Sequence, residues 1–263
     1  MSLRSEQVDL FHNQGYTVAE GFFNRREVAA LQAEVERFKA AGLLRNVATD
    51  GDGETPSSSK ENLQLLPLFD KSDLIRALPF EPKVVEAGRQ LIGTPFILHL
   101  DQMFLKPAHH GIGTAWHQDN AYFKIADPLR GTAMWIAIHD ATVANGTLNI
   151  IPGSYQEEYE HYRDPNSNHH IRCAPPEERA VSLELKAGSI AFFCYGTAHC
   201  TRANTTDRER AGMAFHFLHT DYVDKKRDRP LLCGPDATGG TAEYGVQVAN
   251  TWTREVDRIL NTA

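Results

Sequence analysis

From Pro95 onward, apolar residues recur with a period of two, and this pattern restricts the chain to folds built from short β-strands. The alternation is longest between Phe96 and Leu105. Glycine, proline and asparagine turns separate the other strand candidates, which are Thr132 to Ile138, Thr147 to Ile151, Val181 to Leu185, Ser189 to Phe193 and Ala211 to Leu218. A series of short strands divided by turns is typical of a β-sandwich or a β-barrel.

The first part of the chain has a helical pattern instead. Helices are predicted from about Ser5 to Asn13, from Asn24 to Gly42 and from Glu81 to Leu91. Asn24 is a favourable N-cap, and Glu27 stands three residues later, as in a capping box. Helices followed by a run of strands favour a mainly β fold with flanking helices packed on its outside.

The chain is expected to form a single domain over residues 1–263. Its parts are a helical N-terminal part at about 1–92, a strand core at about 95–220 and a C-terminal extension at 221–263. Two polar segments, residues 48–60 and about 155–179, are rich in turn-forming and charged residues. We expect both to be loops over a mouth of the barrel, where they could act as lids.

Charge and composition argue against several classes of partner. The formal net charge is −7, and the short basic run Lys225-Lys226-Arg227 is flanked by aspartates, so neither nucleic acid nor a membrane surface is expected as a partner. No run approaches the roughly 20 apolar residues of a membrane helix, and no signal peptide is evident, which favours the cytoplasm. The four cysteines lack metal-binding spacing and are expected to be free thiols: Cys173, Cys194, Cys200 and Cys233.

Two His-x-Asp triplets are candidates for metal binding: His117-Gln118-Asp119 and His219-Thr220-Asp221. Such a triplet arises easily by chance, so its surroundings must decide whether it binds a metal. A 2-His-1-carboxylate site needs two ligands close together and a third from a distant strand, and it leaves three coordination positions open. No histidine follows His219, whereas several follow His117, so the first triplet is favoured.

One of the later histidines, His199, follows the strand candidate Ser189 to Phe193. Eleven residues after it, Arg210 opens the next strand, which we expect to pair with the Ser189 to Phe193 strand as its hairpin partner. A guanidinium group there could reach into the barrel, and it binds a carboxylate bidentately. A metal beside such an arginine suits a 2-oxo diacid, because the keto-acid end can chelate the metal while the far carboxylate meets Arg210.

Together these motifs resemble those of the phytanoyl-CoA dioxygenase family. Trp116 to Asn120 is similar to the first metal motif of that family, and Gly146 to Ser154 is similar to its strand and turn, although Tyr155 stands where histidine is common. Further matches in spacing are His199, Asn204, Thr206 and Arg210, together with the opening segment Phe11 to Tyr16. The resemblance covers roughly residues 5–220.

The resemblance implies a double-stranded β-helix, the cupin-like jelly roll. It implies Fe(II) bound by His117, Asp119 and His199. It also implies 2-oxoglutarate as co-substrate and O2 as oxidant, with Arg210, Thr201, Gln102 and Lys60 as the co-substrate contacts. Halogenating relatives of the family replace the carboxylate ligand by a small residue, so the presence of Asp119 argues against halogenation.

Some residues beside the motifs are candidates for the substrate pocket, and others are expected to have no functional role. Asn120, Tyr122 and Phe123 directly follow the metal motif and are candidates for the substrate pocket. The pairs His109-His110 and His169-His170 are expected to be loop residues without a role, because adjacent side chains on an extended backbone point apart. Trp116 and Trp135 are expected in the core.

The expected function is oxidation of a C–H bond of a small molecule, by hydroxylation or oxidative cyclisation, with succinate and CO2 released from the co-substrate. Members of the family act on fatty acyl-CoA, on osmolytes and on natural products, and this chain has no run that resembles a clamp for the phosphates of CoA. A secondary-metabolite intermediate is therefore favoured. Two alternatives remain open: a cupin-like metal enzyme that does not use 2-oxoglutarate, and a non-catalytic sensor or binding module.

Overall fold

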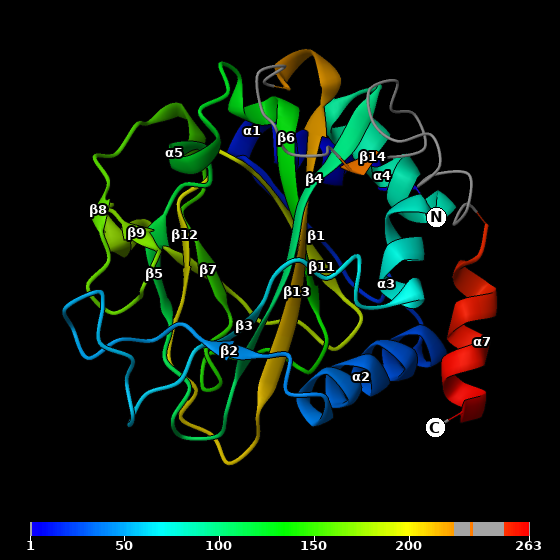
Figure 1. Ribbon diagram of the computed structural model, residues 1–263. Helices are drawn as coiled ribbons and strands as arrows, with labels where there is room; N and C mark the ends of the chain where they lie inside the picture. Colours follow the sequence, from blue (N-terminus) through cyan, green and yellow to red (C-terminus); the bar gives the residue numbers. More distant parts are fainter. Residues whose placement is uncertain (1, 224–231, 234–249, 263) are drawn as a thin grey trace.

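Two antiparallel β-sheets face each other in the computed structural model, which describes residues 2–223, 232–233 and 250–262 (Figure 1). The large sheet has the order β1-β11-β6-β13-β4-β3-β2, with β14 also paired to β4, and the small sheet has the order β10-β7-β12-β5. The large sheet comprises β1 (Tyr16–Ala19), β2 (Arg45–Asn46), β3 (Leu63–Leu65), β4 (Phe96–Lys106), β6 (Gly131–Ala137), β11 (Ile190–Cys194), β13 (Arg210–His219) and β14 (Leu232–Cys233). The small sheet comprises β5 (Thr114–His117), β7 (Leu148–Ile150), β10 (Val181–Leu183) and β12 (His199–Thr201), and a separate hairpin is formed by β8 (Tyr162–Arg163) and β9 (Ile171–Arg172).

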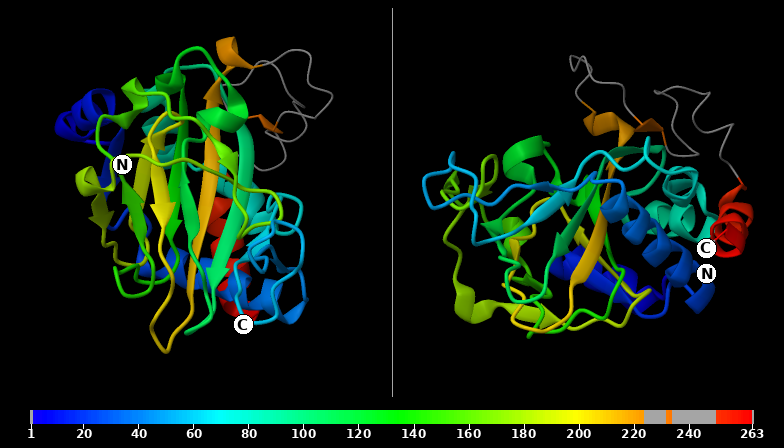
Figure 2. Two further views of the ribbon diagram at one scale, coloured as in Figure 1. Left: turned by 90° about the vertical axis from the view of Figure 1, so that its left-hand side faces the viewer. Right: turned by 60° about the horizontal axis from the view of Figure 1, so that its bottom comes forward.

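The turned views show α2, α3, α4 and α7 gathered on one side of the large sheet and the small sheet on its other side (Figure 2). The helices are α1 (Ser5–Gln14), α2 (Arg25–Ala40), α3 (Asp73–Ala77), α4 (Pro82–Ile92), α5 (Asn120–Phe123) and α7 (Trp252–Thr262). Short 3-10 turns occur at η1 (Leu78–Phe80), η2 (Pro128–Arg130), η3 (Ser154–Gln156), η4 (Glu177–Arg179) and η5 (Thr220–Tyr222).

Local signals position the N-terminal helices where the sequence predicts them. The Asn24 side chain accepts hydrogen bonds from the backbone N–H groups of Arg26 and Glu27, at 2.9 and 3.1 Å, and the Glu27 carboxylate accepts from the Asn24 N–H at 2.7 Å. This capping box satisfies donors that would otherwise lack partners at the start of α2. Helix α1 ends at Gly15, whose φ of 79° suits a glycine.

The mainly β prediction is confirmed, because every predicted strand is present, as β4, β6, β7, β10, β11 and β13. The sequence pattern missed the short strands β1, β3, β5 and β12. Of these, β1 and β3 lie in the part of the chain predicted to be helical, and they pair with β11 and β4 of the large sheet. Strands of three or four residues are too short to display a period of two, so only their pairing partners define them.

The prediction that the strand opened by Arg210 forms a hairpin with the strand before His199 is wrong. Strand β11 pairs with β1 and β6, whereas β13 pairs with β4 and β6, so β6 separates the two. After β11 the chain crosses to the small sheet as β12 and then returns to the large sheet as β13. His199 and Arg210 therefore belong to different sheets, as the crossing connections of a jelly roll require.

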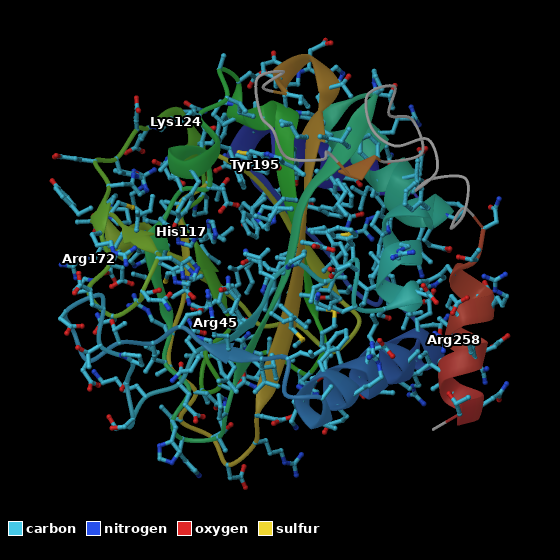
Figure 3. All side chains as sticks on the ribbon, viewed as in Figure 1. Arg45, His117, Lys124, Arg172, Tyr195 and Arg258 are labelled. Carbon is cyan, nitrogen blue, oxygen red and sulfur yellow. The ribbon has the colours of Figure 1, made fainter. Side chains whose placement is uncertain are left out.

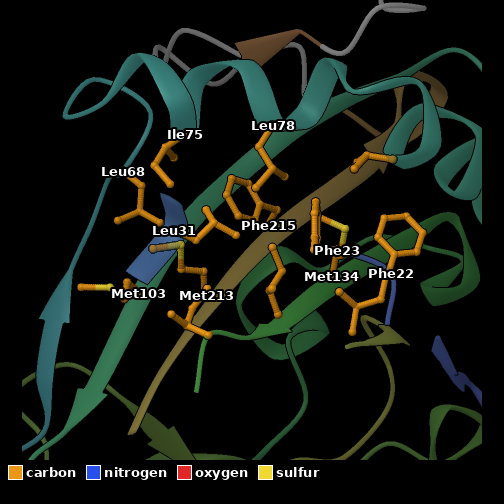
Figure 4. Close-up of a cluster of buried hydrophobic side chains, with 14 of the residues drawn as sticks. Phe22, Phe23, Leu31, Leu68, Ile75, Leu78, Met103, Met134, Met213 and Phe215 are labelled. Carbon is orange, nitrogen blue, oxygen red and sulfur yellow. The ribbon is translucent and has the colours of Figure 1, made fainter. Parts of the chain in front are cut away.

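Apolar cores lie on both faces of the large sheet. The core between this sheet and the helices includes the side chains shown in Figure 4, among them Leu31, Ile75, Leu78, Met103, Met213 and Phe215. The core between the two sheets includes Trp135, Leu148, Ile150, Leu183, Phe193 and Ala214. Strands β6, β11 and β13 are buried along their whole length, so the large sheet is a rigid wall on which a site can be built.

Other composition-based expectations concern membranes and thiols. Within the described ranges, no helix combines the length and apolar character needed to span a bilayer. Cys173, Cys194 and Cys200 are buried free thiols, as predicted. The side chain of Cys233 and the basic run at 225–227 lie outside the described residues.

A buried carboxylate joins three helices around α2. The Glu27 side chain, 7% exposed, accepts hydrogen bonds from Trp252 Nε1 on α7 and from Lys83 Nζ on α4, both at 2.7 Å. The same carboxylate completes the capping box with Asn24. The extension after residue 220, to which the sequence pattern assigned no structure, thus contributes α7 to the helical layer.

Replacement of Glu27 by alanine should lower the free energy of unfolding by about 3 kcal/mol, because it leaves the half-buried Lys83 ammonium and the buried Trp252 indole N–H without their acceptor. Chemical denaturation measures the change. Glu36→Ala on the exposed face of the same helix should cost less than about 0.5 kcal/mol. Equal losses in the two variants would show that Glu27 does not have this role.

Asp101 on β4 anchors the segment that precedes α3. Its carboxylate is buried, Oδ1 accepts a hydrogen bond from the Leu68 N–H at 3.0 Å, and Oδ2 has no hydrogen-bond partner among the described residues. Burial raises the pKa of Asp101 to about 6, although hydrogen bonds from the Leu68 and Phe69 backbone act in the opposite direction. The ionised form of this carboxyl is therefore disfavoured in the folded protein.

This raised pKa predicts that Asp101 makes the protein less stable as the pH rises. The group contributes fully below its unfolded pKa of roughly 4, and that contribution is lost as the pH rises through about 6. The shift corresponds to about 3 kcal/mol. Relative to Asp101→Asn, which does not titrate, the wild type should lose about this much free energy of unfolding between pH 4 and pH 7. A pH-independent difference between the two proteins would contradict the prediction.

Candidate metal centre

His117 and His199 lie directly opposite each other on neighbouring strands of the small sheet. His117 ends β5, His199 begins β12, and the two are Cα partners in antiparallel register. Their ring centroids are 4.2 Å apart. In Figure 3, His117 lies at the small sheet, near β5 and β12. The register of two short strands thus places both imidazoles at one point.

Asp119 follows His117 where the chain leaves the strand. Its backbone has helical angles, φ −58° and ψ −31°, at the start of α5, and this turn brings the carboxylate back toward the two histidines. Asp119 Oδ1 lies 3.7 Å from His117 Nε2 and 3.8 Å from His199 Nε2. The three ligand atoms lie within 4.8 Å of one another, and the described ranges contain no second group of three such residues.

Backbone carbonyls fix which nitrogen of each histidine faces the centre. His117 Nδ1 lies 2.8 Å from the carbonyl oxygen of Ala115, and His199 Nδ1 lies 2.9 Å from that of Thr197. A carbonyl oxygen can only accept, so each Nδ1 carries the proton and each Nε2 has a free lone pair. Two such nitrogens and one carboxylate oxygen are a donor set that fits Fe(II), with coordination positions left open on the cavity side.

The protonation states suit metal binding at neutral pH. Burial lowers the pKa of His117 to about 4, with a further contribution from His199, and burial also lowers the pKa of His199. For Asp119, burial acts to raise the pKa, but the neighbouring His199 and His216 outweigh it and hold the pKa below its ordinary range. The histidines are thus neutral and the aspartate is ionised, which are the forms that coordinate a metal.

His216 on β13 is a functional candidate that the sequence patterns did not reveal. Its side chain is buried, and its Nε2 lies 3.2 Å from Asp119 Oδ2, the carboxylate oxygen that does not face the other two histidines. The imidazole Nε2–H therefore donates to this oxygen and orients the carboxylate. A lone histidine within an apolar strand was the available signal, but no motif distinguishes it from an ordinary core residue.

Gln118, between the two ligands, points away from the centre and anchors the motif. Its amide nitrogen donates to the carbonyl oxygens of Glu157 and Gly196, both at 2.7 Å, and its backbone N–H donates to His161 Nε2 at 3.0 Å. The motif is thereby tied to the loop after β11 and to the polar segment 155–179. These bonds hold Asp119 in a fixed position before any metal binds.

A cavity of about 530 Å³ opens from the metal centre between the two sheets. Its walls are mainly aromatic and aliphatic, and they include Leu66, Phe69, Tyr122, Phe123, Trp135 and Phe193. Among the residues that the structure describes, no lysine or arginine lines it. The volume is within the range of sites for small organic molecules.

Two buried cations lie immediately next to the cavity wall. Thr201 lines the cavity two residues after His199, and its Oγ1 accepts a hydrogen bond from Lys106 Nζ at 2.9 Å. Trp135 also lines the cavity, and the Arg210 guanidinium carbon lies 5.5 Å from its ring centroid. Arg210 donates to the Gly146 carbonyl oxygen, while its Nε has no hydrogen-bond partner among the described residues.

Several further residues named from the sequence also line the cavity. Gln102 does so, and its Oε1 accepts a hydrogen bond from Gln64 Nε2 at 2.9 Å. Tyr122 and Phe123 line it as predicted, and the Tyr122 hydroxyl accepts from the Ile171 N–H at 2.9 Å.

Three residues expected to be uninvolved reach the cavity as well. His169 and His170 are loop residues, but both line the cavity, and Trp135 belongs both to the core and to the cavity wall. Adjacent histidines can face one space here because the chain around them is not an extended strand.

Two candidates are not brought to the cavity. Asn120 uses its side chain to bond the backbone N–H and carbonyl of Ile125, which closes the turn after α5. Lys60 is exposed in the polar loop and does not line the cavity. The second His-x-Asp triplet does not belong to a candidate metal site in the described residues. His219 Nε2 bonds the Thr94 carbonyl at 3.0 Å, and Asp221 is exposed.

The two polar segments predicted as lids contact each other. The Thr49 N–H donates to the Asn166 carbonyl at 3.1 Å, and the Gly53 N–H donates to the Pro165 carbonyl at 2.8 Å. Thr49 Oγ1 donates to the same Pro165 oxygen at 2.6 Å. The segments therefore form one double layer, and the second of them contributes His169 and His170 to the cavity wall.

Comparison with known proteins agrees with this geometry. The model of the phytanoyl-CoA dioxygenase (PhyH) family matches residues 11–212, which is most of the chain. An ectoine dioxygenase of Bordetella parapertussis is 27% identical over 233 residues, which cover 81% of this chain and 74% of that protein. The residues that match the family model, 11–212, include His117, Asp119 and His199 but not His216.

Two solved structures share the fold. The non-haem, α-ketoglutarate-dependent carbocyclase SnoK of nogalamycin biosynthesis has a TM-score of 0.70 and 20% identity, over 93% of this chain and 90% of that one. The epimerase SnoN, in complex with Fe3+, α-ketoglutarate and a nogalamycin compound, has a TM-score of 0.69 and 22% identity, over 89% and 95%. The chain belongs to the phytanoyl-CoA dioxygenase family of iron- and 2-oxoglutarate-dependent oxygenases.

Proposed function

We propose that this protein is a dioxygenase that binds Fe(II) through His117, Asp119 and His199 and uses 2-oxoglutarate to oxidise a C–H bond of a small molecule. The observation that carries the proposal is a 2-His-1-carboxylate group that lines a cavity, together with a buried arginine, Arg210, that packs on the cavity-lining Trp135 and has no carboxylate partner among the described residues. Family membership favours this function over a metal enzyme without 2-oxoglutarate and over a sensor module.

In this proposal each residue near the centre has a separate task. His117, Asp119 and His199 hold the metal, and His216 orients the Asp119 carboxylate through its free oxygen. Arg210 binds the far carboxylate of 2-oxoglutarate, with Thr201 beside it, and Gln102 contacts the co-substrate from β4. The bound iron would supply the oxidising chemistry, in which O2 and 2-oxoglutarate become succinate and CO2 while the substrate is oxidised.

The outcome we propose for the substrate is hydroxylation or oxidative ring closure. Asp119 supplies the carboxylate ligand. Halogenating relatives have a small residue at this place and bind chloride there instead, so halogenation is not proposed. The largely apolar wall around the three ligand residues would exclude bulk water and hold the substrate C–H bond near the bound iron. The double layer of residues 48–60 and 155–179 is the proposed lid.

The cavity favours a largely apolar, uncharged or weakly polar substrate. Its described lining has no lysine or arginine to pair with the phosphates of an acyl-CoA. Aromatic side chains and imidazole groups suit a ring system that carries hydroxyl groups. Similarity to a carbocyclase and an epimerase of nogalamycin biosynthesis supports a natural-product intermediate as the substrate class.

Anaerobic addition of Fe(II) and 2-oxoglutarate should produce a weak visible charge-transfer band, because the keto-acid chelates the metal. His117→Ala and Asp119→Ala should abolish the band at metal concentrations that saturate the wild type. His219→Ala, in the triplet that forms no metal group, is the matched control and should leave the band unchanged. A wild type without the band and without succinate formation would refute the proposed function.

His216→Leu should weaken metal binding by about 10- to 100-fold, because it removes the hydrogen bond that orients Asp119. His216→Gln keeps an N–H donor and should recover most of the affinity. Competition with a metal chelator measures both values. If the two variants bind metal equally well, the hydrogen bond to Asp119 has no part in the affinity.

A further inference from the structure

Lys106, at the end of β4, is a buried cation that the proposed function does not yet use. Its side chain is 1% exposed, which is rare for lysine unless an anion accompanies it. Its ammonium group donates hydrogen bonds to Thr201 Oγ1 and to the carbonyl oxygen of Arg202, both of which are uncharged acceptors. No carboxylate forms an ion pair with Lys106 in the described part of the chain.

A second buried cation stands directly beside it. Arg210 is the Cα partner of Lys106 in the β4–β13 register, and it is also 1% exposed. Burial, followed by the positive charge of Arg210, lowers the pKa of Lys106 well below its ordinary value. Two neighbouring buried cations are costly for a folded protein, because each loses hydration and each repels the other.

A half-buried lysine, Lys83, shows how this chain otherwise treats such a charge. Lys83 Nζ lies 2.7 Å from a Glu27 carboxylate oxygen and 2.8 Å from the other, so its charge is compensated within the protein. Lys106 and Arg210 have no such partner among the described residues. The difference indicates that, within the described residues, no counter-ion is available to them, and that a bound anion could supply one.

The cations adjoin the cavity at the wall where a co-substrate would end. Thr201, which lines the cavity, accepts the Lys106 hydrogen bond, and Trp135, which also lines it, packs against Arg210. His199 is only two residues before Thr201 on the same strand. An anionic group attached to a metal-bound molecule would therefore meet both cations.

We propose that Lys106 is a second cation for the distal carboxylate of 2-oxoglutarate and that, together with Arg210, it makes the site select a 2-oxo diacid over a 2-oxo monoacid. This inference rests on the proposed function and extends it to a residue on a different strand from Arg210. A carboxylate between the two groups removes their repulsion and supplies the missing counter-ion. A monoacid has an apolar group in place of this carboxylate, so both cations would remain without a counter-ion.

The experiment compares the binding of two acids to the Fe(II)-loaded protein without oxygen. They are 2-oxoglutarate and 2-oxopentanoate, which has a methyl group in place of the distal carboxylate, and the visible band of the chelate reports binding of each. The wild type should bind 2-oxoglutarate far more tightly. In Lys106→Met the ratio of the two dissociation constants should fall by at least about tenfold, through weaker binding of the diacid.

Two further variants make the result specific. Lys106→Gln can keep the hydrogen bonds to Thr201 and Arg202 but lacks the charge. It should therefore lose selectivity as Lys106→Met does. If the Lys106→Met protein does not fold, Lys106→Gln takes its place in the experiment. Lys83→Met removes a half-buried lysine of the helical layer and should keep the wild-type ratio.

Folded Lys106 variants that retain the wild-type ratio would overturn the inference and leave the proposed function intact. A wild type that binds neither acid would overturn the proposed function, and this inference with it. Loss of binding of both acids in the Lys106 variants, with the ratio unchanged, would show a structural role only and would also overturn the inference.

Discussion

The antiparallel pairing of β5 with β12 is the constraint on which the rest of this molecule depends. It sets His117 and His199 opposite each other, and the carbonyl groups of Ala115 and Thr197 then fix both rings with Nε2 toward the centre. Both strands are short and could not persist alone. They are held because the small sheet packs on the large sheet, whose central strands are buried on both faces. The helical layer stabilises the metal centre indirectly, by keeping the large sheet rigid.

Charge is distributed unevenly around the cavity, and this arrangement explains how one small space could bind a metal ion, an anionic co-substrate and an organic substrate. At one wall, Asp119 is ionised and oriented by His216, which suits a divalent cation. At a neighbouring wall, Lys106 and Arg210 lack a counter-ion among the described residues, which suits an anion. Apart from Asp101, the remaining lining is aromatic, aliphatic or uncharged polar, which leaves space for an organic substrate that neither wall attracts strongly. A diacid that chelates the metal at one end is the ligand that satisfies both walls at once.

Residues outside the ligand set hold this arrangement in place. Gln118 ties the metal motif to the loop after β11 and to the segment 155–179, so the same side chain connects the metal centre to one half of the proposed lid. The two lid segments are hydrogen-bonded to each other, so motion of one would carry the other with it. Asp101 fixes the segment that contributes Leu66 and Phe69 to the cavity wall.

The sequence by itself determined the mainly β fold and the long helices, and it was enough to propose His117, Asp119, His199 and Arg210 as site residues, because these depend on local periodicity and on motifs of fixed spacing. Only the tertiary structure showed the contacts that make His216 and Lys106 functional candidates. His216 is an isolated histidine in an apolar strand, and Lys106 is a lysine at a strand end; each becomes significant only through a partner far away in the chain, Asp119 and Arg210 respectively. Dependence on contacts far away in the chain also accounts for the wrong hairpin prediction. Spacing along the chain suggested a hairpin between β11 and β13, but strand order within the large sheet is decided by tertiary packing, and β6 lies between the two.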